Sequence, residues 1–147
     1  MTQPAAGRTY VGAYGLCVRD GSILLVRIRA SAPDGGMWTL PGGGVEYGED
    51  PNLTLRREVM EETGLDAVSA TPLAIYSKTY ERSELPPHHP VQHIGIVFAM
   101  EAAGESLRME TDGSTDLCRW VPLAEARQLP LVPLAEFGLD LLTIRST

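Results

Sequence analysis

The sequence predicts a single domain of the α+β class over residues 1–147. Its 147 residues suffice to bury a core without a disulfide or a structural metal. Runs rich in β-branched and aromatic residues alternate with polar loops, and helical segments lie among them and near the C-terminal end. Strands and helices mixed in this way are typical of an α+β or sandwich architecture.

The first predicted element is a β-hairpin. Residues 10–19 and 22–29 are both strand-like, and Asp20-Gly21 between them is a dipeptide favoured in tight hairpin turns. Residues 30–36 form a loop by composition. A short apolar piece follows this loop, so we expect the chain to return toward the core before the next proline.

A helix is predicted over residues 51–63. Asp50 is a suitable N-cap, Pro51 suits the first helical position, and Gly64 can adopt the left-handed conformation that ends a helix. Four apolar side chains form an arc of the helical wheel that we expect to pack in the core: Leu53, Leu55, Val59 and Met60. The other side of the helix should face a cleft.

Three glutamates lie together on that other side. Glu61 and Glu62 follow Glu58 by three and four residues, which returns them to the same helix face. Like charges at these offsets destabilise an isolated helix by roughly 0.2–0.5 kcal/mol per pair, so a cation should compensate them. Carboxylate ligands favour a hard ion, Mg²⁺ or Mn²⁺, which is often shared with the phosphates of a substrate.

The second half of the chain predicts three strands and two helical pieces. The strands are expected at residues 67–81, 91–101 and 116–123. The first of them should break near Pro72, and polar loops should separate the three. Within residues 125–145, two helical pieces are separated around Pro130 and Pro133. Their apolar side chains should belong to the core or to the surface of a homodimer.

Composition and charge limit the possible functions. A net charge of −7 argues against a nucleic-acid partner, which would need a basic surface. No apolar run approaches a membrane span, and the first ten residues lack the apolar stretch of a signal peptide. Cys17 and Cys118 lie far apart in apolar segments, so we expect buried free thiols and a cytoplasmic location.

A glycine-rich turn leads into the predicted helix with a characteristic spacing. Gly43 is followed after five residues by Glu49, and after seven more by Arg57 and Glu58. The positions that complete the pattern are Val59, Met60, Glu61, Glu62, Thr63, Gly64 and Leu65. Residues 43–65 therefore resemble a complete Nudix box, and chance agreement at its seven fixed identities is negligible.

The resemblance implies the Nudix fold, a mixed β-sheet sandwiched between helices. It also implies hydrolysis, with Mg²⁺ or Mn²⁺, of a pyrophosphate bond in a nucleoside diphosphate linked to another group. The expected partner is then a small nucleotide-type molecule. Two alternatives stay open: a catalytically silent nucleotide-sensing module, and a Nudix-fold enzyme that acts on a non-nucleotide diphosphate. Sensing modules usually lose box carboxylates, and this chain has kept all of them.

The resemblance also implies residue roles. The implied metal ligands are the carbonyl of Gly42 and the carboxylates of Glu49, Glu58, Glu61 and Glu62. Arg57 matches the arginine that orients the glutamates, and a planar guanidinium can do so without competing as a ligand. The base that activates the attacking water is Glu58, Glu61 or an additional acid in a later loop. The candidates for that additional acid are Glu110, Asp112 and Asp116.

Substrate selectivity should depend on loops outside the box, at residues 30–36, 81–92 and 103–116. The candidate substrate residues are Arg27, Arg29, Tyr80, His89 and Asp116. The two arginines share one strand face because they are two residues apart, and a solvated edge is their alternative role. Tyr80 and Tyr76 can stack a base or simply pack. A metal cluster of His88, His89 and His93 is not favoured in a proline-rich turn.

Overall fold

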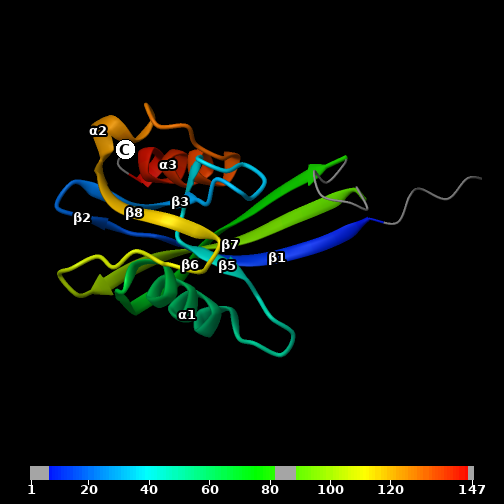
Figure 1. The fold of residues 1–147 in the computed structure, drawn as a ribbon, viewed down its shortest axis with the longest axis horizontal. Helices are drawn as coiled ribbons and strands as arrows, with labels where there is room; N and C mark the ends of the chain where they lie inside the picture. The colour runs from blue at the N-terminus through cyan, green and yellow to red at the C-terminus, as the bar shows by residue number, and fades with distance from the viewer. Residues whose placement is uncertain (1–6, 82–88, 146–147) are drawn as a thin grey trace, which may run out of the picture.

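The computed structural model describes residues 7–81 and 89–145, and its first sheet is mixed (Figure 1). This sheet has four strands in the order β5-β1-β7-β6. Their bounds are β5 Gly42–Gly44, β1 Arg8–Leu16, β7 Val91–Ala103 and β6 Asp66–Tyr80. The two central strands, β1 and β7, run parallel, and the outer strands pair antiparallel with them. The parallel pair brings residues near the N-terminus beside residues from the second half of the chain.

The second sheet is antiparallel and is centred on β3. Its strands are β2 Val18–Arg19, β3 Ser22–Ile28, β4 Trp38–Thr39 and β8 Thr115–Pro122. The longest pairing joins β3 to β8, and β2 and β4 share the other edge of β3. Asp20 and Gly21 have φ values of 51° and 79° between β2 and β3, as a tight hairpin turn requires. The predicted turn is confirmed, but the hairpin is limited to β2 and the start of β3, because residues 8–16 form β1 and pair with β5 and β7 in the first sheet.

Helices cover both sides of the sheets (Figure 1). Helix α1 Pro51–Thr63 lies below the sheets in that view, and α3 Pro133–Arg145 lies above them. The short helix α2 Leu123–Ala126 precedes α3, so the two predicted C-terminal helical pieces are confirmed. The α+β class and the arrangement of sheet between helices are confirmed as well. No helix within the described residues is long and apolar enough to cross a membrane.

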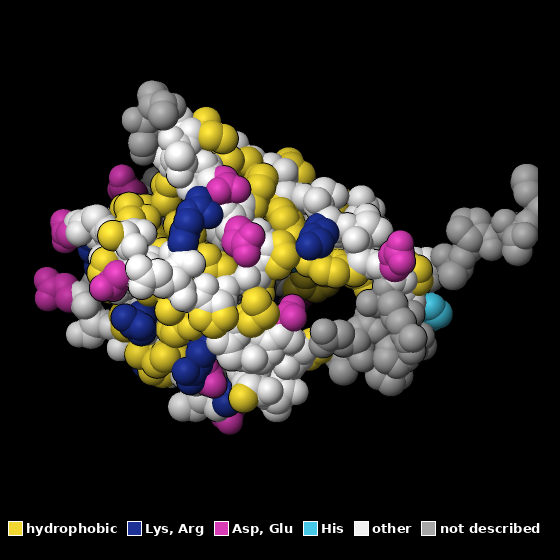
Figure 2. Space-filling model, turned by 90° about the horizontal axis from the view of Figure 1, so that it is seen from above, with side chains coloured by type: hydrophobic (Ala, Val, Ile, Leu, Met, Phe, Trp, Pro, Cys, Tyr) yellow, Lys and Arg dark blue, Asp and Glu magenta, His cyan; other side chains and the backbone are white. Residues whose placement is uncertain are grey.

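The core consists of two apolar clusters. One lies under α3 and includes Trp38, Leu40 and Leu139, and the other lies under α1 and includes Leu55 and Phe98. The apolar C-terminal segment therefore contributes to the core. The predicted buried thiols are present, because Cys17 and Cys118 are both buried and free. On the described part of the face seen in Figure 2, acidic and basic side chains are interspersed among apolar ones.

The predicted apolar arc of α1 is wrong at two positions. Leu55 and Val59 are fully buried, but Leu53 is 62% exposed and Met60 is 39% exposed. A helix turns about 100° per residue, so Leu53 lies roughly 200° around the axis from Leu55. The buried stripe instead runs through Leu55, Val59 and Glu62, which are spaced by four and three residues. One of the three glutamates therefore lies on the packed face of the helix.

Candidate active site

The turn before α1 places backbone directly against two of the glutamates. The amide N–H of Gly42 donates a hydrogen bond to Glu62 Oε1 at 2.8 Å. Gly42 has a φ of 141°, and a Cβ there would lie 2.1 Å from the carbonyl oxygen of Ala13. A Cβ at Gly43 would lie 2.6 Å from the carboxyl carbon of Glu58. Gly42 is thus required by its φ and by its close approach to β1, and Gly43 leaves room for the carboxylate of Glu58.

Helix α1 is held in place by the caps that its sequence predicts. The side chain of Asp50 accepts a hydrogen bond of 2.8 Å from the amide of Asn52. At the other end, Gly64 is left-handed with a φ of 77°, and its amide donates to the carbonyl of Met60. These caps satisfy polar groups at both helix ends. They therefore fix the positions of Glu58, Glu61 and Glu62 in the second half of the helix.

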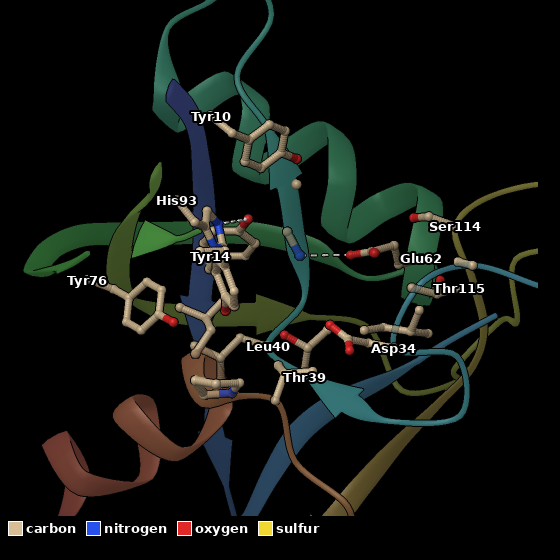
Figure 3. A pocket seen from close by; sticks show the side chains of 18 residues that line it. Tyr10, Tyr14, Asp34, Thr39, Leu40, Glu62, Tyr76, His93, Ser114 and Thr115 are labelled. Atoms are coloured by element: carbon tan, nitrogen blue, oxygen red, sulfur yellow. Dashed lines mark hydrogen bonds between the residues drawn. The ribbon is translucent and has the colours of Figure 1, made fainter. Parts of the chain in front are cut away.

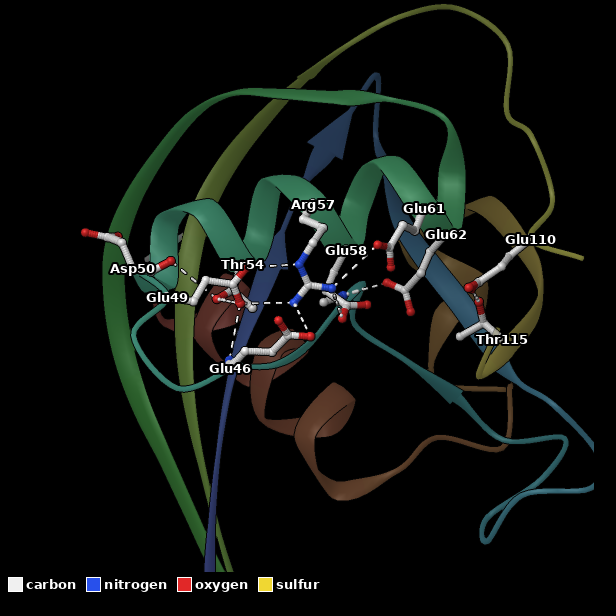
Figure 4. Close-up of polar contacts among 11 residues, drawn as sticks. Glu46, Glu49, Asp50, Thr54, Arg57, Glu58, Glu61, Glu62, Glu110 and Thr115 are labelled. Atoms are coloured by element: carbon white, nitrogen blue, oxygen red, sulfur yellow. Dashed lines mark hydrogen bonds and ion pairs between the residues drawn. The ribbon is translucent and has the colours of Figure 1, made fainter. Parts of the chain in front are cut away.

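Arg57 connects the carboxylates of this region (Figure 4). Its Nε and Nη2 donate to the two oxygens of Glu49 at 2.9 and 3.0 Å. Its Nη1 donates to Glu58 Oε1 at 3.0 Å and lies 3.5 Å from Glu61 Oε1. One planar guanidinium thus orients carboxylates before and within the helix, which is the placement expected for an orienting arginine.

Glu49 is engaged on both oxygens. In addition to Arg57, the hydroxyl of Thr54 donates to Glu49 Oε1 at 2.7 Å. Hydrogen bonds from Arg57 and then from Thr54 lower the pKa of Glu49 to about 2. Glu49 is therefore ionised and anchors the arginine. Its additional role as a metal ligand stays a prediction.

Burial and repulsion from neighbouring carboxylates disfavour charge on Glu58 and Glu62. Burial raises the pKa of Glu62 well above its usual range, although the hydrogen bond from Gly42 opposes this. Burial, followed by the negative charge of Glu61, raises the pKa of Glu58. Within the described residues, no Lys or Arg pairs with Glu62. A bound cation would relieve both costs of ionisation.

The donor set fits a hard cation by its chemistry. Glu58, Glu61 and Glu62 offer only oxygen atoms, which Mg²⁺ and Mn²⁺ prefer. The three carboxylates and their repulsion also call for a positive charge beyond that of Arg57. Within the part of the chain that the structure describes, no three acidic, histidine or cysteine side chains already stand together as a preassembled cation site.

A cavity of about 270 Å³ opens beside these carboxylates (Figure 3). On one side it is bounded by Glu62, Gly42 and Gly43. On the other side it is lined by aromatic side chains of the first sheet, Tyr10, Tyr14, Tyr76, Tyr80 and His93. The same cavity thus touches the glutamate site and a group of aromatic rings.

Comparison with known proteins assigns the family. A family model of the NUDIX domain matches residues 7–139. The chain belongs to the Nudix family. This confirms the assignment made from residues 43–65, and with it the expectation that the chain is a Nudix hydrolase.

Similar proteins include hydrolases of several nucleotide substrates. An ADP-ribose pyrophosphatase of Methanocaldococcus jannaschii is 36% identical over 103 residues, which cover 69% of this chain and 56% of that protein. The chain thus spans little more than half of that relative. An 8-oxo-dGTP diphosphatase of Proteus vulgaris is 25% identical over 107 residues, covering 73% of this chain and 88% of that protein.

A solved structure has the same architecture. The crystal structure of a MutT NUDIX hydrolase from Burkholderia pseudomallei is 28% identical, with a TM-score of 0.73. The match covers 90% of this chain and 96% of that one. The Nudix fold thus extends over nearly the whole described chain.

Several predicted substrate residues lie outside the lining of this Nudix pocket. Ile28 lines it, whereas the neighbouring Arg27 and Arg29 are not among the lining residues. Arg27 Nε donates to Asp116 Oδ1 at 2.8 Å and lowers the pKa of that carboxyl. Arg29 Nε donates to the carbonyl of Gly113 at 2.7 Å. These contacts brace β8, and a substrate role for either arginine or Asp116 stays a prediction.

The other candidates divide between the pocket and the surface. Tyr80 lines the pocket, whereas His89 is exposed and is not among the lining residues. His88 lies outside the described residues. Of the candidate acids, Glu110 lies near Glu58 and Glu62, and its negative charge contributes to raising the pKa of both. Asp112 shares a surface hollow with Glu110 and Glu61.

The sequence analysis did not predict that Tyr10, Tyr14 and His93 line the pocket. Tyr10 and Tyr14 are four residues apart on β1 and so share a strand face, a signal that was present in the sequence. Their position depends on the parallel pairing of β1 with β7, which sets Tyr10 opposite His93. Tyr14 Oη and His93 Nε2 are 2.8 Å apart. That long-range pairing has no local sequence signature.

Proposed function

We propose that this chain is a divalent-cation-dependent pyrophosphohydrolase that cleaves the diphosphate of a nucleotide or nucleotide conjugate. The observation that carries this proposal is the shared cavity, which touches Glu62 and the Gly42–Gly43 backbone on one side and aromatic rings on the other. A diphosphate at the carboxylates and an organic group among the rings would occupy it together. Three similar proteins support it by their activities: the ADP-ribose pyrophosphatase, the 8-oxo-dGTP diphosphatase and an RNA pyrophosphohydrolase of Mesorhizobium japonicum.

Each box residue then has a definite task. Glu58, Glu61 and Glu62, with the carbonyl of Gly42, would hold Mg²⁺ or Mn²⁺. The ion, when bound, supplies neutralisation of phosphate oxygens and a lower pKa for the attacking water. Arg57 keeps Glu58 and Glu61 oriented through contacts of 3.0 and 3.5 Å. The Gly42 amide fixes the carboxylate of Glu62 at 2.8 Å.

A proton must leave the attacking water, and two residues of the helix can accept it. Glu61 is the more accessible, with 47% of its side chain exposed, and Glu58 is held more tightly by Arg57. Loss of a general base typically costs about 10²–10⁴-fold in rate. Comparing the pH–rate profiles of Glu58→Gln and Glu61→Gln assigns the base, because the variant lacking it should lose the acidic limb of the profile.

The test of the proposed function is a substrate panel with Mg²⁺ or Mn²⁺. The panel contains (d)NTPs, oxidised nucleotides, ADP-ribose, nucleotide sugars and dinucleoside polyphosphates, and the assay measures release of phosphate or nucleoside monophosphate. Glu61→Gln should lower turnover of the preferred substrate by about 10²–10⁴-fold. Glu125→Gln, an exposed glutamate on α2, is the matched control and should retain full turnover. Unchanged turnover in Glu61→Gln would contradict the proposal.

The same panel separates the alternatives. A nucleotide-sensing module would bind members of the panel and release no product with either metal. An enzyme for non-nucleotide diphosphates would leave the whole panel intact but cleave a simple organic diphosphate. We also propose a cytoplasmic location, which the two buried free thiols support. Cell fractionation tests that location directly.

A further inference from the structure

The hydroxyl of Tyr76 is a buried polar group with an unmet hydrogen-bonding capacity. Tyr76 lies on β6 and is only 6% exposed. Its Oη has no partner at hydrogen-bond distance and angle within the described residues, although burial and then the nearby Tyr80 hydroxyl raise its pKa. Buried hydroxyls are nearly always paired, so an unpaired one in a cavity calls for a partner that enters from outside. Tyr76 is itself a lining residue of the pocket described above.

The ring of Tyr76 is held from two sides. Its centroid is 5.5 Å from the ring of His93 and 5.4 Å from the ring of Phe137 on α3, both in edge-on geometry. Contacts of this kind fix the plane of the ring. Figure 3 shows the hydroxyl directed from β6 toward the interior of the pocket. The group is therefore positioned in advance for a ligand.

The pocket around Tyr76 suits an uncharged aromatic group. Among the described lining residues the charged ones are Asp34 and Glu62, which are both acidic, and none is Lys or Arg. A phosphate far from the glutamate site would therefore find no positive partner among these residues. Tyrosine rings line the space between Tyr76 and Glu62, and aromatic rings of a ligand can pack on them (Figure 3).

His93 does not change this charge pattern. Burial lowers the pKa of His93, which keeps the imidazole neutral at physiological pH. The ring is surrounded by Tyr10, Tyr14 and Tyr76 at centroid distances of 5.3, 5.6 and 5.5 Å. Its Nε2 is already bonded to the hydroxyl of Tyr14 at 2.8 Å. The Tyr76 hydroxyl has no such bond within the described residues and can bind a ligand.

We propose that the Tyr76 hydroxyl is a specificity-determining group that hydrogen-bonds the nucleobase of a substrate whose single nucleoside occupies this pocket. The inference rests on the proposed function for its orientation, with the diphosphate toward Glu62. A base fits better than a sugar, because a sugar would leave most of its hydroxyls unpaired against Leu40, Val132 and Leu134. A cavity of about 270 Å³ also suits one nucleoside rather than two.

The test measures binding of neutral nucleosides without metal. Adenosine, guanosine, cytidine and uridine are titrated into the protein with EDTA and followed by amide chemical shifts, with ribose as the probe that lacks a base. At least one nucleoside should bind more tightly than ribose. Tyr76→Phe should raise the dissociation constant of that nucleoside by about 3- to 10-fold, because one hydrogen bond is lost. The melting temperature of this variant should be equal or higher, because a buried unpaired hydroxyl has been removed.

Two controls make the result decisive. Tyr47→Phe removes a hydroxyl from a fully exposed tyrosine outside the pocket and should bind as the wild type does. Equal binding by Tyr76→Phe, or nucleosides that bind no better than ribose, would overturn the inference. Nucleoside binding without hydrolysis of any panel substrate would instead refute the proposed function alone. Hydrolysis combined with equal binding by Tyr76→Phe would refute this inference alone.

Discussion

The two sides of the pocket are organised by different forces. On the carboxylate side, the guanidinium of Arg57 contacts Glu49, Glu58 and Glu61, and charge dominates every contact. On the tyrosine side, the rings of Tyr14 and Tyr76 pack edge-on against His93 and that of Tyr10 is tilted, and no Lys or Arg of the described residues lines the pocket. Changes on the first side should mainly affect turnover, and changes on the second should mainly affect which substrate binds.

After Glu61→Gln, the next largest effect is expected from Arg57→Ala. This change removes the hydrogen bonds to Glu49 and Glu58 and leaves the carboxylates of the helix without an orienting cation. Residues that orient ligands typically contribute about 10- to 100-fold to activity or metal affinity, so kcat/KM should fall by that factor. Steady-state kinetics over a range of Mg²⁺ concentrations measures it.

The matched control for Arg57→Ala is Arg56→Ala. Arg56 is the preceding residue and pairs with Asp66 at 2.8 Å, away from the box glutamates. Its removal should leave kcat/KM unchanged within a factor of about two, since exposed ion pairs contribute little. Equal losses in both variants would show that Arg57 acts through helix stability rather than through orientation.

A second expected effect concerns the contact between β5 and α1. Gly43→Ala places a Cβ about 2.6 Å from the carboxyl carbon of Glu58, so the side chain must move. The carboxylate is the far end of a flexible side chain, so its displacement should cost little stability, whereas turnover should fall because Glu58 leaves the position that Arg57 fixes. Urea denaturation and steady-state rates measure both. A loss of stability above about 1 kcal/mol, as in an overpacked core, would place the strain in the backbone of β5 instead.

The tyrosine side should show its own pH dependence of stability. Burial lowers the pKa of His93 in the folded state, so the unfolded chain binds a proton more readily. The contribution of neutral His93 to the free energy of unfolding is then fully present above the unfolded pKa of about 6.5, and it declines as the pH falls below that value. Denaturant midpoints between pH 8 and pH 5 test this. His93→Gln should reduce that decline, and an unchanged slope would assign the pH dependence to other groups.

The smallest effect is expected from Glu49 at acidic pH. Its folded pKa is lowered to about 2, so its stabilising contacts are complete above the unfolded value of about 4.3. They are lost as the pH falls from there toward 2. Glu49→Gln should therefore lower stability at neutral pH and flatten the acid transition in this window. The same acid midpoint in both proteins would contradict the assigned Arg57 contact.

The carboxylate side could be predicted because its determinants are local. The caps Asp50 and Gly64, and the spacing of Glu58 from Glu61 and Glu62, all lie within one helix and its flanks. The contacts of Arg57 reach back only as far as Glu46, eleven residues earlier in the chain. Local geometry and the family resemblance were therefore enough to anticipate the arrangement there.

The tyrosine side could not be predicted because it depends on distant pairing. The hydrogen bond between Tyr14 and His93 joins residues 79 apart in sequence, and it exists because β1 and β7 pair in parallel. The error at Leu53 and Met60 has a related cause. Apolar character alone did not identify the packed face of α1, which also buries Glu62 beside the Gly42 turn.

The irregular strand β6 has a consequence for self-association. It forms one edge of the first sheet and runs for 15 residues, with Val68 and Ile75 exposed along it. A long regular edge of this kind can template pairing with another chain and lead to aggregation. Pro72 lacks an amide hydrogen, and the strand register shifts immediately after it. The edge is thus divided into two shorter segments, which protects this molecule against growth into extended cross-β assemblies.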